Sequence, residues 1–413
     1  MTELTDTHRG LLDSLDADAM LGDVMAWSAQ NSGSRNSEGL REMRGQLADA
    51  FSGLPGHVSE TPLPDQVVVD ECGREVGLAL EPALEVSVRP NAPVHVVLTG
   101  HYDTVFPKDF HFQTPELVDG DTVHGPGTAD MKGGLRVMLE ALRAFEAHPD
   151  RNNVGYTVLL SPDEEIGSPG SATRLAELGR RAHVGMTFEP ALADGSLAGA
   201  RKGSGNFALT VRGRAAHAGR EHHLGRNAVA ALARFIVGLD ALNGQREGVT
   251  FNIAKVDGGG ATNIVPEVAV GRFNVRMVES EDCDWIENEV AKLVAGVNAE
   301  DGITAELSGG FSRPPKPMSP ANVTVFDWVK RAGAALGQDI RWAPSGGVCE
   351  GNNLWAAGCP NVDTLGVRGG EIHSDREYMI VSSLAERAKL SALILSRIAE
   401  GEYDARALKA MVA

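Results

Sequence analysis

The sequence predicts an α/β protein with a mostly parallel sheet, helices on both faces of that sheet, and an inserted ferredoxin-like α+β domain. Between about residues 65 and 200, apolar strands without polar alternation are separated by amphipathic helices, which is typical of a parallel sheet buried on both faces. From about residue 205 to 310 the strands alternate apolar and polar residues, as expected where one face is covered. The proline-rich segment 312–320 then leads into further helices and short strands.

The first part of the chain, roughly 55 residues, is predicted to be helical. Ser37 is a suitable N-cap for one of these helices. The apolar residues that follow share one helical face, and the sequence GLPG ends the helix; these residues are Leu40, Met43, Leu47 and Phe51.

The α/β part then alternates strands and helices. The order is a strand at 94–100, a helix at 131–148, a strand at 155–160, a helix at 171–181 and a strand at 183–188. The inserted part has the order β-α-β-β-α-β, which predicts a ferredoxin-like motif with two helices on one sheet face. Its elements are expected at 207–213, 227–242, 249–256, 268–278, 280–299 and 303–309.

We expect three segments from this pattern. Residues 1–203 form the first part of a catalytic α/β domain, residues 204–316 form the inserted domain, and residues 317–413 complete the α/β domain.

Composition excludes several classes of protein. The net charge of -18 over 413 residues argues against nucleic acid or an anionic membrane as the main partner. Four widely spaced cysteines indicate a reducing compartment rather than a disulfide scaffold. The beginning of the sequence lacks the basic and apolar regions of a signal peptide, and no apolar run is long enough for a membrane span. We therefore expect a cytoplasmic location.

Polar side chains follow several of the predicted strands. The carboxyl ends of parallel strands form the crevice in which open α/β sheets bind ligands. Imidazole and carboxylate groups that converge there suit a divalent metal such as zinc. These side chains are His101, Asp103, Asp130, Glu164, Glu165, Glu189 and His373.

Each of these residues alone is more often a solvated surface group. The loop GPGTADMKGG has a second interpretation, as a loop that binds a phosphate group. The loop matches neither GxxxxGK[ST] nor GxGxxG. Asp130 also lies at the helix N-terminus where an anion would bind. A carboxylate there repels phosphate and attracts a cation, so a phosphate-binding α/β enzyme is the weaker hypothesis.

Four motifs in this order, GHYDTV, GPGTADMKGG, DEEIGS and a late HSD, resemble those of the dinuclear zinc amidohydrolase family. This family includes bacterial glutamate carboxypeptidase, aminoacylase, acetylornithine deacetylase and succinyl-diaminopimelate desuccinylase. The resemblance covers essentially the whole chain. It implies two Zn²⁺ ions, with Co²⁺ as a possible substitute, and a homodimer in which the inserted segment 204–316 is the lid and dimerisation domain.

The resemblance also implies roles for individual residues. Asp130 would bridge the two ions, His101 and Glu189 would complete one site, and His373 and Glu165 the other. Asp103 would orient the His101 ring. Glu164 would be the general base that takes a proton from water and delivers it to the leaving amine.

Four further residues in the inserted domain match family segments. RAAHAG resembles the segment that brings a lid histidine, here His217, to the oxyanion, usually in the partner subunit. Asn263 matches a substrate-contacting asparagine, and Arg276 and Arg313 match arginines that bind a substrate carboxylate. One segment departs from the family, because Cys349 and Glu350 replace a usual Ser/Thr-Asp pair.

The expected activity is hydrolysis of an amide bond next to a free carboxylate. Glu189, where family dipeptidases tend to have Asp, favours a carboxypeptidase acting on glutamate-type conjugates or an N-acyl-amino-acid deacylase. The substrate would be a small molecule or short peptide with a free carboxylate. An N-deacetylase or desuccinylase of a biosynthetic intermediate, and a catalytically inactive binding relative, are the alternatives.

Overall fold

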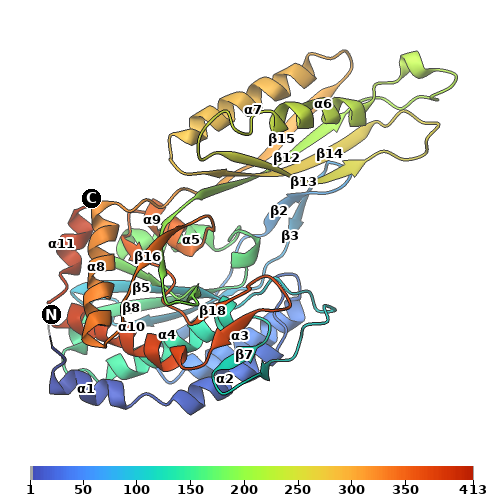
Figure 1. Cartoon of the computed structure of the whole chain (residues 1–413). Helices are drawn as coiled ribbons and strands as arrows, with labels where there is room; N and C mark the ends of the chain where they lie inside the picture. The colour runs from blue at the N-terminus through green and yellow to red at the C-terminus, as the bar shows by residue number, and fades with distance from the viewer. Residues whose placement is uncertain (1–2, 413) are drawn as a thin grey trace. The chain divides into compact units, whose positions relative to one another are not determined.

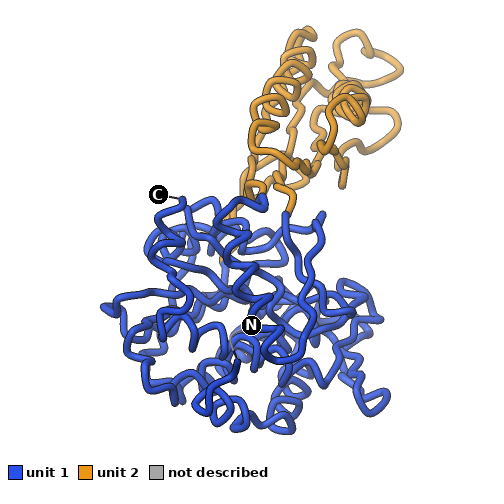
Figure 2. The backbone as a smooth tube through the Cα atoms, turned by 60° about the vertical axis from the view of Figure 1, so that its left-hand side comes forward, with its two compact units in different colours: residues 1–64, 80–200, 316–413 blue, residues 65–79, 201–315 orange. Residues whose placement is uncertain are grey.

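The structure is a computed structural model in which residues 3–412 are described. The chain divides into two compact units (Figure 2). Unit 2 comprises residues 65–79 and 201–315, and unit 1 comprises the other described residues. Each unit has its own apolar core.

A six-stranded sheet forms the centre of unit 1 (Figure 1). Its strands lie in the order β1 (His57–Thr61), β4 (Ala83–Val88), β8 (Val154–Ser161), β5 (Val94–His101), β9 (Val184–Thr187) and β17 (Asn361–Val362). Strands β8, β5, β9 and β17 are parallel, whereas β4 is antiparallel to both of its neighbours. The sheet is therefore mixed, with a parallel part where the predicted ligands follow the strands.

Alternate residues of the central strands face two separate apolar clusters. Val96 and Leu98 belong to the larger cluster, and Val97 belongs to a smaller one. The helices that contribute to the larger cluster are α2 (Ala17–Ala29), α3 (Ser37–Phe51), α4 (Gly133–Glu146), α8 (Pro320–Ala335), α10 (Ser383–Ala399) and α11 (Ala405–Ala410). The smaller cluster contains residues of α5 (Ala172–Arg181) and α9 (Glu350–Ala356). Helices thus cover both sheet faces, as the sequence predicts.

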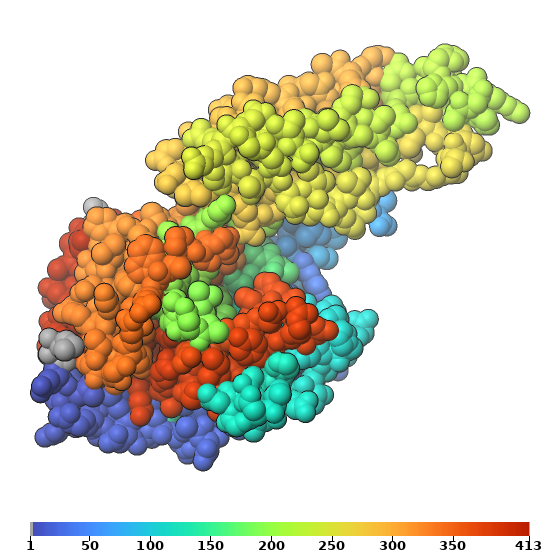
Figure 3. Space-filling view, in the orientation of Figure 1, coloured from blue at the N-terminus to red at the C-terminus, as the bar shows by residue number. Residues whose placement is uncertain are grey.

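Shorter elements complete unit 1. A second sheet has the order β10 (Ala191–Leu192), β18 (Arg368–Gly370), β19 (Tyr378–Ile380), β7 (Thr122–His124) and β6 (Glu116–Leu117), and β11 (Leu197–Arg201) pairs with β16 (Trp342–Ser345). Helix α1 (Asp6–Asp13) packs against α10, so segments from the beginning and the last part of the chain are neighbours in unit 1 (Figure 3).

Unit 2 contains a four-stranded antiparallel sheet with two helices. The strand order is β13 (Thr250–Gly258), β14 (Val268–Met277), β12 (Gly203–Arg212) and β15 (Thr304–Arg313). Helices α6 (Ala228–Asp240) and α7 (Asp282–Asn298) share one apolar cluster with the strands. The order along the chain is β-α-β-β-α-β, as predicted.

The hairpin formed by β2 (Gln66–Val69) and β3 (Glu75–Leu78) also belongs to unit 2, although the sequence places it in the first part of the catalytic domain. Two arginines of the four-stranded sheet bind its main chain. The Nη2 atom of Arg272 donates to the Val69 carbonyl at 2.7 Å, and that of Arg212 donates to the Gly73 carbonyl at 2.6 Å. These long-range contacts leave no local pattern in the sequence.

Two smaller predictions need correction. The N-cap of α3 is Asn36 rather than Ser37, because the Asn36 Oδ1 accepts from the Gly39 N–H at 3.2 Å. The helix expected from residue 131 begins at Gly133, after the irregular turn η1 (Thr128–Lys132). Among residues 3–412, no helix combines the length and apolar character that crossing a membrane requires.

Candidate metal centre

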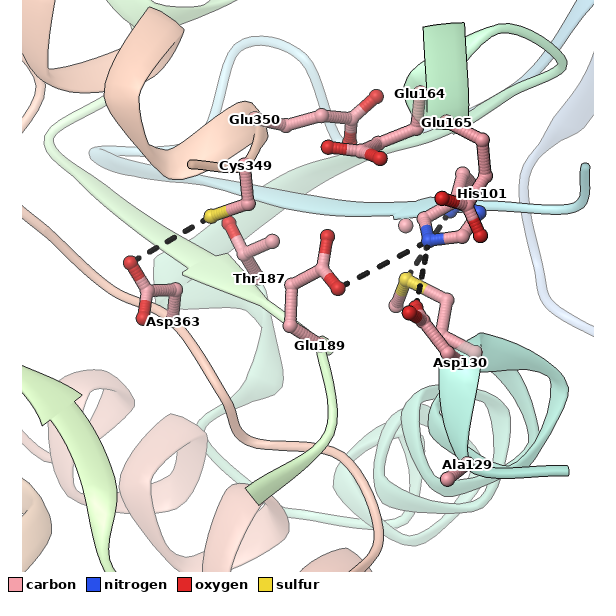
Figure 4. A network of polar contacts seen from close by, with 12 residues as sticks. His101, Ala129, Asp130, Glu164, Glu165, Thr187, Glu189, Cys349, Glu350 and Asp363 are labelled. Atoms are coloured by element: carbon pink, nitrogen blue, oxygen red, sulfur yellow. Dashed lines mark hydrogen bonds and ion pairs between the residues drawn. The ribbon is translucent and has the colours of Figure 1, made fainter. Parts of the chain in front are cut away.

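Three parallel strands of unit 1 end at the same edge of the central sheet. Strand β5 ends at His101, which pairs with Ser161 at the end of β8, and β9 ends at Thr187. Just beyond these ends lie the turn η3 (Glu164–Ile166) and Glu189. Since the carboxyl ends of parallel strands share one crevice, side chains from distant parts of the sequence meet here (Figure 4).

Asp130 lies between two histidines. Its Oδ1 is 3.1 Å from the His101 Nε2, and its Oδ2 is 3.3 Å from the His373 Nε2. Glu189 Oε2 lies 3.9 Å from the His101 Nε2, and Glu165 Oε2 lies 3.2 Å from the His373 Nε2. All five side chains proposed as ligands therefore come together, as two His–Glu pairs that share one aspartate.

A buried carboxylate outside this set holds the Asp130 loop in place. Glu377 accepts hydrogen bonds from the main-chain N–H groups of Gly127, Ala129 and Asp130, each at 2.9 Å. Burial raises the pKa of Glu377 to about 7, although these N–H donors oppose the shift. Sequence reasoning missed Glu377, because an acid shortly after HSD carries no signal until the loop it contacts is known.

Asp103 contacts His101 at the end of β5 and the turn that follows β8. Its Oδ1 accepts from the Glu164 N–H at 3.1 Å, and its Oδ2 accepts from the Glu165 N–H at 3.2 Å and from the Ser34 hydroxyl at 2.7 Å. The His101 Nδ1 lies 3.0 Å from the Asp103 main-chain oxygen and 3.3 Å from Oδ1. Asp103 thus orients both the imidazole and the turn that carries the two glutamates.

The centre concentrates negative charge in a buried place. Hydrogen bonds with Asp130 and Glu165 raise the pKa of His373 to about 11. Burial and the charge of Asp130 raise the pKa of Glu165 to about 8. Burial alone would raise the pKa of Asp130, but hydrogen bonds from His101 and His373 bring it below its usual range. Protonated groups here balance carboxylates that a cation would otherwise balance.

These residues fit a divalent metal. The Oε1 atom of Glu189 is buried and has no hydrogen-bond partner among residues 3–412. Ligand atoms of His101, Asp130 and Glu165 lie within 4.8 Å of one another, and so do those of His101, Glu164 and Glu189. Imidazole nitrogen and carboxylate oxygen are the donors that zinc and similar ions accept. Glu164 lies close enough to this group to act on a molecule bound there.

The four other predicted site residues lie in unit 2, as two separate groups. His217 forms a β-bridge with Ile264, and the Ala218 N–H donates to the Asn263 carbonyl at 2.9 Å. The Nδ1 of His217 accepts from the main-chain N–H groups of residues 219 and 220, so its Nε2 carries the ring proton. The structure thus places His217 and Asn263 side by side.

Arg276 and Arg313 form the second group. Strand β12 lies between β14 and β15, and its residue Ser204 is paired with Arg276 of β14 on one side and with Arg313 of β15 on the other. Burial and the neighbouring Arg313 lower the pKa of Arg276. One nitrogen of Arg276, Nη1, is buried and has no hydrogen-bond partner within the part of the chain that the structure describes. An anionic ligand would satisfy this nitrogen of Arg276.

Residues 97–397 match the model of peptidase family M20/M25/M40. The chain belongs to this family. Carboxypeptidase G2 of Pseudomonas sp. (strain RS-16) is 27% identical over 336 residues, which cover 80% of each chain. Succinyl-diaminopimelate desuccinylase of Nitrosospira multiformis is 28% identical over 292 residues, or 67% of this chain and 75% of that protein.

Solved structures show the same fold. A tripeptidase from Staphylococcus aureus has a TM-score of 0.72 at 24% identity, with 94% of this chain and 99% of that chain covered. An M20 family metallo-carboxypeptidase from Sulfolobus solfataricus has a TM-score of 0.67 at 17% identity, with 92% and 99% covered. Family membership and the histidine–carboxylate cluster identify the chain as a metal-binding hydrolase of amide C–N bonds.

The departure at Cys349 and Glu350 lies beside the centre (Figure 4). Glu350 is fully buried and accepts a hydrogen bond from the Ser161 hydroxyl, while its Oε2 has no hydrogen-bond partner among the described residues. Burial, together with the charges of Glu164 and Glu189, raises the pKa of Glu350 well above its usual range. Sequence reasoning recorded this departure but did not place Glu350 among the site residues.

Cys349 has a different environment from Glu350. Its sulfur lies 3.7 Å from Asp363 Oδ2, and that carboxylate pairs with Lys316 Nζ at 2.7 Å. The Cys349 sulfur also accepts a hydrogen bond from the Gly351 N–H at the start of α9. These contacts give Cys349 a structural role at the helix start.

Proposed function

We propose that this protein is a dinuclear zinc hydrolase that cleaves an amide bond next to a free carboxylate. The observation that carries the proposal is the position of Asp130, whose two oxygens face two different imidazoles, each paired with its own glutamate. An aspartate in this position can bridge two ions, and three carboxylates against two divalent cations leave a net positive site.

The residues around the centre can perform the proton transfers. Two zinc ions bound there would lower the pKa of water and polarise the substrate carbonyl. Glu164 takes the proton of the attacking water and delivers it to the leaving amine nitrogen. The Asp103 carboxylate accepts a hydrogen bond from the Glu164 N–H, and this contact fixes the main chain that carries the base.

Unit 2 supplies substrate contacts in this proposal, and its geometry favours a homodimer. Arg276 and Arg313 flank Ser204 near the start of β12, whereas His217 follows the other end of this strand, Arg212. Eight strand residues span about 26 Å, so the two groups belong to opposite ends of β12. In this proposal His217 acts from a partner subunit, and the arginines belong to the subunit that holds the substrate.

The relatives give two candidate substrate classes. Similarity to carboxypeptidase G2 supports cleavage of a C-terminal glutamate-type conjugate, and similarity to succinyl-diaminopimelate desuccinylase supports removal of an acyl group from an amino acid. Both substrates present a carboxylate to Arg276 and Arg313. An activity screen of the Zn²⁺-loaded protein distinguishes the two substrate classes. The panel contains N-acyl amino acids and conjugates of glutamate or aspartate.

Metal removal is the direct test of the hydrolase. Dialysis against a chelator should abolish hydrolysis and lower the Tm, because the clustered carboxylates lose their counter-ions. Zn²⁺ or Co²⁺ should restore both quantities, measured as initial rates and by thermal unfolding. Hydrolysis that persists after the metal content has fallen to zero would exclude the proposed chemistry, and metal binding without hydrolysis of any panel member would indicate an inactive binding relative.

His217→Ala should lower kcat roughly 100-fold, because one donor to a developing oxyanion contributes about this much. The site of action can be tested by mixing His217→Ala with Glu164→Gln subunits after dissociation. If His217 acts on the partner, about a quarter of wild-type activity should return, since half of randomly mixed dimers are heterodimers with one complete site. No recovery in mixtures shown to contain heterodimers would mean that His217 does not act across subunits.

A further inference from the structure

The two proposed metal sites differ in how firmly the structure holds their histidines. His101 is fully buried at the end of β5, and its ring contacts Asp103. His373 lies on the segment between β18 and β19, and 54% of its side chain is exposed. Its φ of 64° lies in the left-handed region, which residues other than glycine seldom adopt. The position of His373 therefore depends on the contacts of the segment around it.

Glu377 joins the segment that carries His373 to the loop that carries Asp130. Its side chain is fully buried, and its carboxylate accepts three main-chain N–H groups of that loop, each at 2.9 Å. The Glu377 carbonyl accepts from the Gly125 N–H at 3.2 Å. On its own segment, the Glu377 N–H donates to the Ser374 carbonyl at 3.2 Å. One residue thus fixes two metal-binding segments that lie far apart in the sequence.

The arrangement of donors requires a carboxylate at this position. Oε2 of Glu377 accepts from Gly127, and Oε1 accepts from both Ala129 and Asp130. An amide of the same size has one oxygen and one NH₂ group, so at least one of the three N–H groups would face another donor. A buried N–H without an acceptor is unfavourable. Glu377→Gln should therefore loosen the Asp130 loop with almost no change in volume.

A second long-range contact of the His373 segment is weaker. Asp375 Oδ2 lies 3.0 Å from His111 Nε2, but both side chains are exposed. Exposed pairs of this kind contribute little, because solvent screens the charges and both side chains lose conformational freedom. Of the two contacts, the buried one at Glu377 is therefore the one that can fix the distance between His373 and Asp130.

We propose that Glu377 is a positioning residue that holds Asp130 and His373 at the distance needed to bind the second metal ion. The inference rests on the proposed function, in which Asp130 bridges two ions. His101 and Glu189 depend less on this contact, because both directly follow or end strands of the central sheet. Loss of the Glu377 contacts should therefore affect the two ions unequally, and the ion at His373 should be lost first.

The test is a zinc titration of the metal-free full chain in competition with a chromophoric chelator. The wild type should bind two ions per chain. In Glu377→Gln the affinity for the second ion should fall about 10- to 100-fold, as on removal of an outer hydrogen-bond partner, while the first affinity stays close to the wild-type value. The visible spectrum of the first bound Co²⁺ should also be unchanged. A general loss of stability would not separate the two ions in this way.

Asp282→Asn is the matched control. Asp282 is also a buried carboxylate that accepts a main-chain N–H, from Glu279 at 3.2 Å, but it lies in unit 2. This variant should bind both ions as the wild type does. Glu377→Asp, which keeps both oxygens on a shorter side chain, should show the same unequal loss and provides the measurement if Glu377→Gln does not fold.

Hydrogen exchange of the metal-free chain tests the contact itself. The amides of the Asp130 loop should exchange faster in Glu377→Gln than in the wild type. An unchanged affinity for the second ion, or an equal loss of both ions, would overturn the inference. A wild type that takes up fewer than two ions would instead contradict the dinuclear centre of the proposed function, so the two failures are distinguishable.

Discussion

Glu164→Gln should lower kcat by roughly 100- to 10,000-fold and leave the metal content unchanged. Glutamine keeps the size of the side chain and the main-chain contact to Asp103, but it cannot accept a proton from water. Glu164 is buried with 7% of its surface exposed, so solvent cannot readily replace it as the base. Saturation kinetics measure kcat, and elemental analysis of the same samples measures the metal content.

The matched control is Glu116→Gln, on the exposed strand β6, which should leave turnover unchanged. Near-normal turnover of Glu164→Gln would remove this residue from the chemistry. Loss of metal would instead identify Glu164 as a ligand, a possibility raised by the short separation of its carboxylate from His101 and Glu189.

Asp130→Asn should disrupt both metal sites at once and reduce hydrolysis to background. An amide has one neutral oxygen to offer, whereas the carboxylate presents Oδ1 toward His101 and Oδ2 toward His373. The loss of zinc affinity should exceed the 10- to 100-fold that follows removal of an outer hydrogen-bond partner. Competition with a chromophoric zinc chelator measures this affinity for both ions.

Asp13→Asn, an exposed position on α1, serves as the control and should bind zinc as the wild type does. Circular dichroism and the Tm establish that each variant folds. A folded Asp130→Asn variant that still holds two ions per chain would show that Asp130 does not bridge them.

Much of the fold could be predicted because its signals are local. Helix α3 and the β-α-β-β-α-β order of unit 2 follow from periodicity over short windows. The N-cap Asn36 was missed by one residue because Asn and Ser are both good caps. The hairpin at 65–79 was assigned to the wrong unit, since its partners Arg212 and Arg272 lie more than a hundred residues away.

The candidate site could be predicted only where its motifs stand at strand ends. His101, Glu165 and Glu189 follow apolar runs, so their common location follows from parallel strands. Glu377 and Glu350 had no such signal. Each becomes significant through one long-range contact, with the Asp130 loop and with Ser161 respectively.

By itself, the sequence determined which groups can bind metal, because imidazole and carboxylate donors and the apolar runs that precede them can be read residue by residue. Tertiary structure alone decided which oxygen faces which imidazole and which carboxylate holds the Asp130 loop. It also decided that the hairpin of β2 and β3 belongs to unit 2. The reason is physical: coordination and hairpin packing depend on distances of a few ångströms between segments that lie far apart along the chain, and those distances exist only once the strands have paired.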